Sequence, residues 1–237
     1  MKNHEIKITL LLKQDVSLVN VQEFLSSNIN KSMLEDSTLK EMHSKNIFKP
    51  YSIGSLYPFD LQNKIYKANQ IYVLTIRSID EKFLNRLNKV LKSSRKLDFN
   101  VIAIEQLSRK SGHIESAFTL TPAILSIKED GMERVRYWTR EDGNLEFVKQ
   151  RIKDNLERKY EQFFNEKIVA PDDFIVMLSI QNRKPMVYNY KGGKLFSNKF
   201  KIMFAPDEIS QKLASLAFGV GILEKNSLGF GFLTKGR

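Results

Sequence analysis

His43 is the residue of this chain whose type and setting best suit proton transfer. The sequence has three histidines, His4, His43 and His113, and no cysteine. Histidine titrates close to neutral pH, so its side chain can accept or donate a proton at that pH. His43 lies near the end of a predicted short helix, and Lys49 follows it six residues later. The alternative is an exposed histidine at a helix end that has no catalytic role.

Other kinds of active site match this sequence poorly. The histidines are far apart and show no His-x-x-x-His spacing, so we expect no metal centre. No glycine loop is followed by Gly-Lys-Ser or Gly-Lys-Thr, and the third glycine of a dinucleotide fingerprint is missing. The lack of cysteine removes disulfides, thiolate zinc ligands and cysteine nucleophiles. We therefore expect no cofactor.

A glycine-rich stretch near the C-terminus is the second candidate site. Residues 219–231 read Gly-Val-Gly-Ile-Leu-Glu-Lys-Asn-Ser-Leu-Gly-Phe-Gly and contain four of the eleven glycines. Glycine permits positive φ and close approach to the backbone, and clustered backbone N–H groups beside a lysine suit an anion. A turn that only joins a helix to a strand is the alternative. The residues predicted to bind an anionic partner are Gly219, Gly221, Lys225, Asn226, Ser227, Gly229 and Gly231.

The charge of the chain favours a polyanionic partner. The formal net charge is +11, and the basic excess is spread over both halves of the sequence. Nucleic acid is the first choice and a membrane surface the second. Basic residues interleaved with Tyr137 and Trp138 suit an RNA backbone and stacked bases, although a solvated helix face is the alternative for any single lysine. The predicted contacts are Arg134, Arg136 and Arg140, with Lys149, Arg151, Lys153, Arg158 and Lys159 on the following helix.

The expected location is the cytoplasm, with no membrane partner. No apolar run approaches the roughly 18 residues that span a bilayer, and the N-terminus enters a strand pattern directly, without the apolar core of a signal peptide. The hydrophobic content of 42% is enough for a packed core.

The N-terminal half positions His43 among strands and helices of a recognisable order. Apolar residues alternate from Ile6 to Leu12, as in a half-buried strand, and then recur at helical spacing. A capping box from Ser78 to Glu81 begins a later helix. The predicted elements are strand 5–12, helix 18–34, short helix 38–44, strands 49–57 and 66–76, helix 83–91 and strand 99–104. This β-α-β-β-α-β order defines a ferredoxin-like unit.

A similar order recurs after a polar linker at residues 111–116. The predicted elements are strands 120–127 and 135–138 around a turn at 129–131, helix 145–163, strands 174–180, 186–190 and 196–204, a turn at 191–194, a helix after Pro206 and a final strand 228–234. The sequence therefore predicts an α+β protein of two tandem ferredoxin-like, RRM-like domains, residues 1–115 and 116–237. The first domain carries His43, and the second ends in the glycine-rich loop.

The motifs and the order of elements together resemble one family. The stretch from Glu224 to Gly231, the basic charge and the tandem order are similar to the CRISPR-associated repeat-processing endoribonucleases, the sixth Cas family of the RAMP superfamily. The spacing of His43 and Lys49, followed by Pro50-Tyr51-Ser52, resembles the family's helix-then-strand region.

Two features depart from the family pattern. Members often have Gly-x-Gly before the Glu-Lys pair, but Leu223 stands where the second glycine would be. Some members use a tyrosine well before the histidine, whereas this chain has Asn28, Asn30 and Ser32 in that region. A full His-Tyr-Lys triad is therefore not carried over to this sequence.

The resemblance implies metal-independent cleavage of CRISPR repeat RNA (pre-crRNA) by its own 2′-hydroxyl, giving a 2′,3′-cyclic phosphate and a 5′-hydroxyl. His43 would be the general base or acid, and Lys49 would stabilise charge on the scissile phosphate. The glycine-rich loop would grip the RNA. Proteins of a CRISPR effector complex and a homodimer are further partners that the resemblance leaves open.

Two other functions stay open at this point. A non-catalytic RAMP-type guide-RNA-binding subunit of an effector complex would share the fold, the charge and the glycine loop without a competent histidine. The absent tyrosine is compatible with such a subunit, whereas the His43–Lys49 spacing argues against it. An unrelated basic RNA-binding module is the third interpretation, which the glycine motif disfavours.

Overall fold

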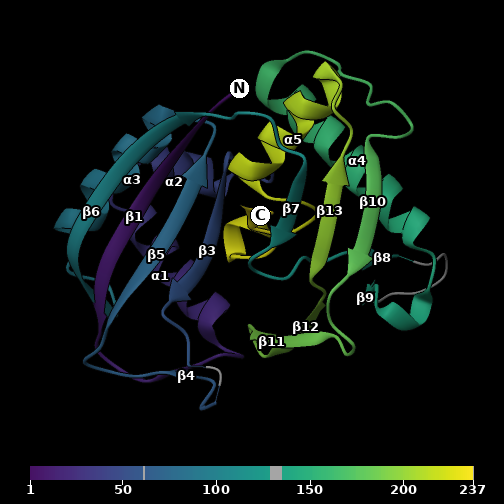
Figure 1. Cartoon of the computed structure of the whole chain (residues 1–237). Helices are drawn as coiled ribbons and strands as arrows, with labels where there is room; N and C mark the ends of the chain where they lie inside the picture. Colours follow the sequence, from purple (N-terminus) through teal and green to yellow (C-terminus); the bar gives the residue numbers. More distant parts are fainter. Residues whose placement is uncertain (61, 129–134, 237) are drawn as a thin grey trace.

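The protein consists of two four-stranded antiparallel sheets that lie side by side and are packed against helices (Figure 1). This computed structural model describes residues 1–60, 62–128 and 135–236. The prediction of an α+β protein with two tandem ferredoxin-like units is confirmed, because both sheets have the strand order of that fold. The predicted turn at 129–131 and Arg134 lie outside the described residues.

The N-terminal sheet has the order β3-β5-β1-β6. Its elements are β1 (Lys2–Leu12), α1 (Val21–Met33), α2 (Ser37–Ser44), β3 (Tyr51–Tyr57), β5 (Ile71–Ser78), α3 (Glu81–Ser93) and β6 (Phe99–Lys110). The alternation along β1 buries Ile6, Ile8 and Leu10 completely on the face covered by helices. A short pair, β2 (Val16–Ser17) with β4 (Ile65–Tyr66), lies at one end of the sheet.

Two predictions for this half were wrong in detail. The single strand 66–76 is divided into β4 and β5, because the chain turns between them at Asn69, whose φ is +58°. The capping box at Ser78 is also wrong, because Asp80 caps α3 by accepting a hydrogen bond from Phe83 N. The Ser78 hydroxyl instead donates to the Pro50 carbonyl and ties β5 to the chain before β3.

The C-terminal sheet repeats the order as β10-β13-β7-β14. Its elements are β7 (Ser116–Thr119), α4 (Leu145–Phe164), β10 (Ile175–Ile180), β13 (Phe200–Phe204), α5 (Glu208–Val220) and β14 (Leu233–Lys235). The additional elements are the pair β8 (Ser126–Ile127) and β9 (Arg136–Tyr137), the hairpin β11 (Met186–Tyr190) and β12 (Gly193–Ser197), and the 3-10 turns η1 (Arg140–Asp142) and η2 (Asn226–Leu228).

Three strand predictions for this half had the wrong bounds. The first strand is 116–119 instead of 120–127, because the chain leaves the sheet after Thr119, makes isolated bridges at Ala123 and Ile124, and forms a strand again only at β8. The strand 196–204 is divided, because β12 pairs with β11 whereas β13 pairs with β10 and β7. The strand 228–234 is reduced to 233–235, because η2 and two glycines of positive φ precede it.

The two halves of the chain are joined by shared apolar contacts. The buried cluster of the N-terminal half also contains Ile124, Tyr188, Leu195 and Phe230 from the C-terminal half. Helix α5 lies between the two sheets in Figure 1, and it contacts β1, β3 and β5. Residues 111–115 connect the halves without a helix or strand, and the boundary at 115/116 stays a prediction.

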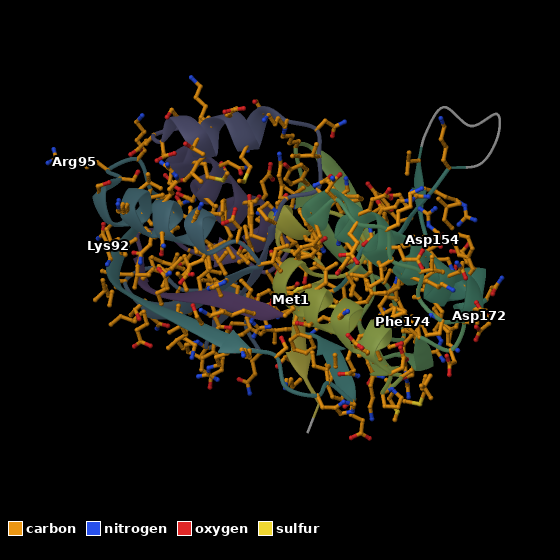
Figure 2. The ribbon with its side chains drawn as sticks, turned by 90° about the horizontal axis from the view of Figure 1, so that it is seen from above. Met1, Lys92, Arg95, Asp154, Asp172 and Phe174 are labelled. Atoms are coloured by element: carbon orange, nitrogen blue, oxygen red, sulfur yellow. The ribbon has the colours of Figure 1, made fainter. Side chains whose placement is uncertain are left out.

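The long axis of the molecule runs across both sheets. Seen from above, Lys92 and Arg95 project at one end, Asp172 lies at the other, and Met1 lies between them (Figure 2). In the part of the chain that the structure describes, no helix is long and apolar enough to span a membrane.

Candidate functional site

His43 lies in the last turn of α2 and is partly buried. Asp36 begins this helix by accepting a hydrogen bond from Leu39 N at 3.0 Å, and Leu39 anchors it in the core. The helix ends at Ser44, and the side chain of Lys49 returns to that end. Its ammonium group donates to the carbonyl oxygens of Met42, His43 (3.3 Å) and Lys45 (2.6 Å). Lys49 therefore caps the helix that carries His43.

His43 and Lys49 line a cavity of about 350 Å³ that both halves of the chain form. Helix α1 contributes polar side chains, including Ser27 and Asn30. The C-terminal half contributes Ser227 and Leu228 from the glycine-rich stretch. Three of the predicted site residues, His43, Lys49 and Ser227, thus meet at one place although they are far apart in the sequence.

Burial and nearby cations favour the neutral form of His43. Partial burial lowers the pKa of His43 below its usual 6.5, and the charges of Lys49 and Lys191 lower the pKa further. The carbonyl groups at the helix end would favour the imidazolium form, but the Lys49 ammonium already neutralises them. Lys45 pairs with Glu41 at 2.7 Å, so its charge is also balanced. A neutral imidazole near neutral pH is the form that accepts a proton.

Burial also changes the other titratable groups of the cavity. It lowers the pKa of Lys49 and raises that of Tyr51, although the Ser227 hydroxyl opposes the shift at Tyr51. The Tyr51 hydroxyl donates to the sulfur of Met33 at 3.6 Å, and this tyrosine is 1% exposed. The Tyr51 hydroxyl therefore stays protonated, and the residue forms an apolar part of the cavity wall.

Sequence reasoning missed Lys191 and Tyr190, which border the same cavity. Both come from the hairpin β11–β12, which turns at Lys191 and Gly192 with positive φ at both residues. This turn confirms the one predicted at 191–194. The hairpin docks on the first turn of α1 and the residues before it. Asn189 N donates to Val19 O at 2.8 Å, and Lys191 N donates to Glu23 Oε1 at 2.9 Å.

The four glycines of the stretch 219–231 are buried, and they serve close internal contacts. Gly221, Gly229 and Gly231 have positive φ. A methyl group at Gly229 would lie 1.9 Å from Gln22 Oε1, and one at Gly231 would lie 2.2 Å from the Ile222 carbonyl oxygen. The glycines therefore let the loop fold on itself and against α1. Lys225 is exposed, and Ser227 and Leu228 are partly exposed.

Two polar side chains hold this loop from inside. Lys159 of α4 is 1% exposed, and its ammonium group donates to Gly221 O at 2.9 Å, Leu223 O at 3.0 Å and Asn226 Oδ1 at 2.6 Å. The Asn226 amide donates to Ile222 O at 2.8 Å and Phe230 O at 2.9 Å. Burial lowers the pKa of Lys159 to about 7, whereas Glu224 and the three acceptor oxygens favour its ammonium form. The sequence prediction placed both side chains on the RNA-binding surface, whereas the structure places them inside the protein.

Leu223, the departure from the family pattern, adopts the backbone conformation of a glycine. Its φ is +54°, in the left-handed region that favours glycine, and its side chain is 1% exposed. The loop therefore keeps its shape with a buried leucine at this position.

The two described residues of the predicted arginine cluster, Arg136 and Arg140, do not line the cavity. Arg136 donates to Asp142 Oδ1 at 2.5 Å, and Arg140 is exposed in η1. Trp138 is 2% exposed and contacts Phe200, so it is not available for stacking on a base. Within residues 1–60, 62–128 and 135–236, no group of three or more histidine, aspartate or glutamate side chains could hold a metal ion.

Comparisons with known proteins point to one family. The C-terminal domain model of the CRISPR-associated protein Cas6 matches residues 104–234, which is more than half of the chain. A relative from Methanocaldococcus jannaschii, CRISPR-associated endoribonuclease Cas6 2, is 28% identical over 242 residues that cover 96% of this chain and 98% of the relative.

Solved structures show the same fold. One described as CRISPR associated protein Cas6 has a TM-score of 0.75 at 21% identity and covers 99% of this chain and 100% of its own. Another, described as a RAMP protein binding different RNA substrates, has a TM-score of 0.72 at 18% identity and covers 100% of both chains. Because identity to both is low, they support the fold alone.

Proposed function

The chain belongs to the Cas6 family of CRISPR-associated proteins, and on this basis we propose that it is an endoribonuclease that binds and cleaves CRISPR repeat RNA. The relative from Methanocaldococcus jannaschii, which matches nearly the whole chain, is named an endoribonuclease. One observation of this molecule carries the proposal. His43 and Lys49 share a cavity with Ser227 of the glycine-rich loop and Lys191 of the hairpin, so a proton acceptor lies among cationic and hydroxyl groups.

The proposed reaction is a transesterification within the RNA that requires no metal. His43 accepts the proton of the 2′-hydroxyl at the scissile nucleotide, and the 2′-oxygen bonds to the adjacent phosphorus. The bond from phosphorus to the 5′-oxygen breaks, and the leaving oxygen takes a proton from the imidazolium or from water. The products are a 2′,3′-cyclic phosphate and a 5′-hydroxyl. The lowered pKa of His43 supports the role of base, because the imidazole is neutral at neutral pH.

The two lysines have different tasks in this proposal. Lys49 is committed to the carbonyl groups at the end of α2, so its charge acts on the phosphate from a distance while it holds His43 in place. Lys191 is exposed at the hairpin turn and borders the cavity. It can approach the scissile phosphate and stabilise the charge that develops there.

RNA binding is proposed for the exposed rim of the cavity and its surroundings. Lys225 and Ser227 contact the RNA backbone, while Asn226 and the glycines shape the loop that presents them. Arg136 and Arg140 contact parts of the RNA that are farther from the scissile phosphate. Proteins of an effector complex and a second copy of this chain stay predictions from the resemblance.

Cleavage of the cognate repeat RNA in EDTA tests the proposal. We expect the wild-type protein to give a product with a 2′,3′-cyclic phosphate, detected because it resists phosphatase until acid opens the ring. A repeat with 2′-deoxyribose at the scissile nucleotide is expected to bind with unchanged affinity and to stay intact. Tight binding of the unmodified repeat without cleavage would instead identify a guide-RNA-binding subunit.

A further inference from the structure

Helix α4 contacts both walls of the cavity without lining it. Lys159 and Gln162 lie three residues apart and therefore share one face of the helix. Lys159 holds the glycine-rich stretch through Gly221 O, Leu223 O and Asn226 Oδ1. Gln162 reaches the segment between α2 and β3, which leads from His43 to Lys49.

The contact of Gln162 is a matched pair of hydrogen bonds with the backbone of Phe48. Phe48 N donates to Gln162 Oε1 at 2.9 Å, and Gln162 Nε2 donates to Phe48 O at 2.9 Å. A side-chain amide that satisfies both backbone groups of one residue fixes the orientation of that residue. Phe48 directly precedes Lys49, whose side chain caps α2. The contact with Gln162 therefore also fixes the backbone position from which Lys49 reaches the end of that helix.

The two contacts are connected to each other. The Phe48 ring lies 5.8 Å from Lys159 Nζ, within the range of a cation–π contact. The three N–H groups of Lys159 meet three acceptors in a buried setting, so no other orientation of this group satisfies them equally well. The glycine-rich loop, α4 and the segment before β3 therefore form one continuous chain of contacts.

We propose that Lys159 and Gln162 are positioning residues of the active site, which set the distance between the segment of His43 and Lys49 and the loop tip at Ser227 and Leu228. This inference rests on the proposed function. Lys159 is 1% exposed and Gln162 does not line the cavity, so neither side chain is placed to act on the scissile phosphate in the proposed site. Their effect is expected in the rate of cleavage and not in the affinity for RNA.

The decisive variant is Gln162→Met, because Gln162 is exposed and the substitution removes both hydrogen bonds while keeping the length of the side chain. We expect the single-turnover rate to fall about 10-fold, less than the 10²-fold loss that a displacement of about 1 Å can cause. The Kd for a 2′-deoxy repeat should stay within about twofold of the wild-type value. The matched control is Gln150→Met on the same helix, which loses only a surface bond to Asp154 and should cleave at the wild-type rate.

A titration of His43 in the free protein provides a second measurement that does not depend on cleavage. The chain has three histidines, so their ring resonances can be assigned by NMR with His43→Ala as reference. In Gln162→Met, loosening of the segment before β3 should raise the pKa of His43 toward 6.5, because burial and the Lys49 charge both lower it in the wild type. Lys159→Met should raise it too if the variant folds, which its Tm reports.

The outcomes separate the two proposals. A wild-type protein that cleaves, together with a Gln162→Met variant of unchanged rate and unchanged His43 pKa, overturns the positioning role and leaves the proposed function intact. A wild-type protein that binds its repeat without cleaving overturns the proposed function. In that case a raised pKa in Gln162→Met still supports the contact chain, and an unchanged pKa overturns it.

Discussion

The two halves of the molecule share an order of strands and helices but differ most in three connections. The N-terminal half has two α-helices, α1 and α2, between its first and second sheet strands, whereas the C-terminal half has one α-helix, α4, after the short pair β8–β9 and the turn η1. The C-terminal half has the hairpin β11–β12 between its second and third strands. It also has residues 221–232 between its last helix and strand, where the N-terminal half has only 94–98.

The residues of the proposed site come from those three connections. His43 lies on α2, Lys191 lies in the hairpin turn, and Ser227 follows α5. The two sheets that the halves share therefore position the site, whereas the residues proposed to act on the RNA lie in the connections that differ between the halves. A ferredoxin-like unit alone thus says little about function, because function depends on the groups that its connections add.

The largest expected effect is the loss of the proton acceptor on α2. His43→Ala should lower the cleavage rate by about 10² to 10⁴, the usual contribution of a general base. The wild-type rate should fall as the pH drops through a pKa below 6.5, since protonated His43 cannot accept a proton. The variant should lose this step in the pH–rate profile.

The matched control for this comparison is His113→Ala, an exposed histidine in the connection between the halves. Its rate and pH profile should equal those of the wild type. If both histidine variants lost activity equally, the chemistry would not be specific to α2.

The second prediction concerns the long connection after α5. Gly231→Ala places a methyl group 2.2 Å from the Ile222 carbonyl oxygen at a φ of +70°, so we expect the free energy of unfolding to fall by about 3 kcal/mol or more. Gly143→Ala has open space around it, so its loss comes from backbone strain at a φ of +63° alone and should be smaller, about 1 to 3 kcal/mol. Urea denaturation measures both. Equal losses would show that steric contact inside the loop is unimportant.

The third prediction concerns the hairpin turn. Lys191→Ala should lower the cleavage rate about 10-fold, because a charge that stabilises the scissile phosphate is removed. It should also raise the pKa of His43, since the Lys191 charge lowers that pKa in the wild type. Lys194→Ala, an exposed lysine of the same hairpin, is the control. Equal effects of both substitutions on rate would indicate general attraction of RNA instead of a local role.

Much of the frame could be predicted from the sequence, because strands and helices have different apolar periods. The errors fall where that period carries no information, as at residues 120–127 and 196–204, where the chain crosses between sheets. The meeting of His43 with Ser227 was not predicted, because it depends on how the two halves of the chain pack against each other. The position of Lys191 could not be predicted, since it depends on hydrogen bonds between Asn189 and the residues just before α1, about 170 residues earlier.

Lys159 is a different case, because a signal was present in the sequence. Ile152, Leu156 and Lys159 follow one another at helical spacing, which places the lysine on the buried stripe of α4. A lysine on an apolar stripe implies an internal partner, since a buried ammonium group needs acceptors. The partner itself, the carbonyl groups of the glycine-rich stretch, follows only from the folded chain.

The smallest expected effect is the difference in stability between two variants of Leu223, the position where this loop departs from the family pattern. Leu223 has a φ of +54° and a buried side chain, so removal of the side chain should cost about 2 to 5 kcal/mol in either a glycine or an alanine variant. In ordinary helices and strands alanine is more stable than glycine by roughly 0.5–1 kcal/mol. At Leu223 the order should reverse, with Leu223→Gly about 1 kcal/mol more stable than Leu223→Ala, because glycine adopts the left-handed conformation without strain. Urea denaturation of the two variants decides the point, and a more stable alanine variant would mean that the loop relaxes away from positive φ once the leucine side chain is gone.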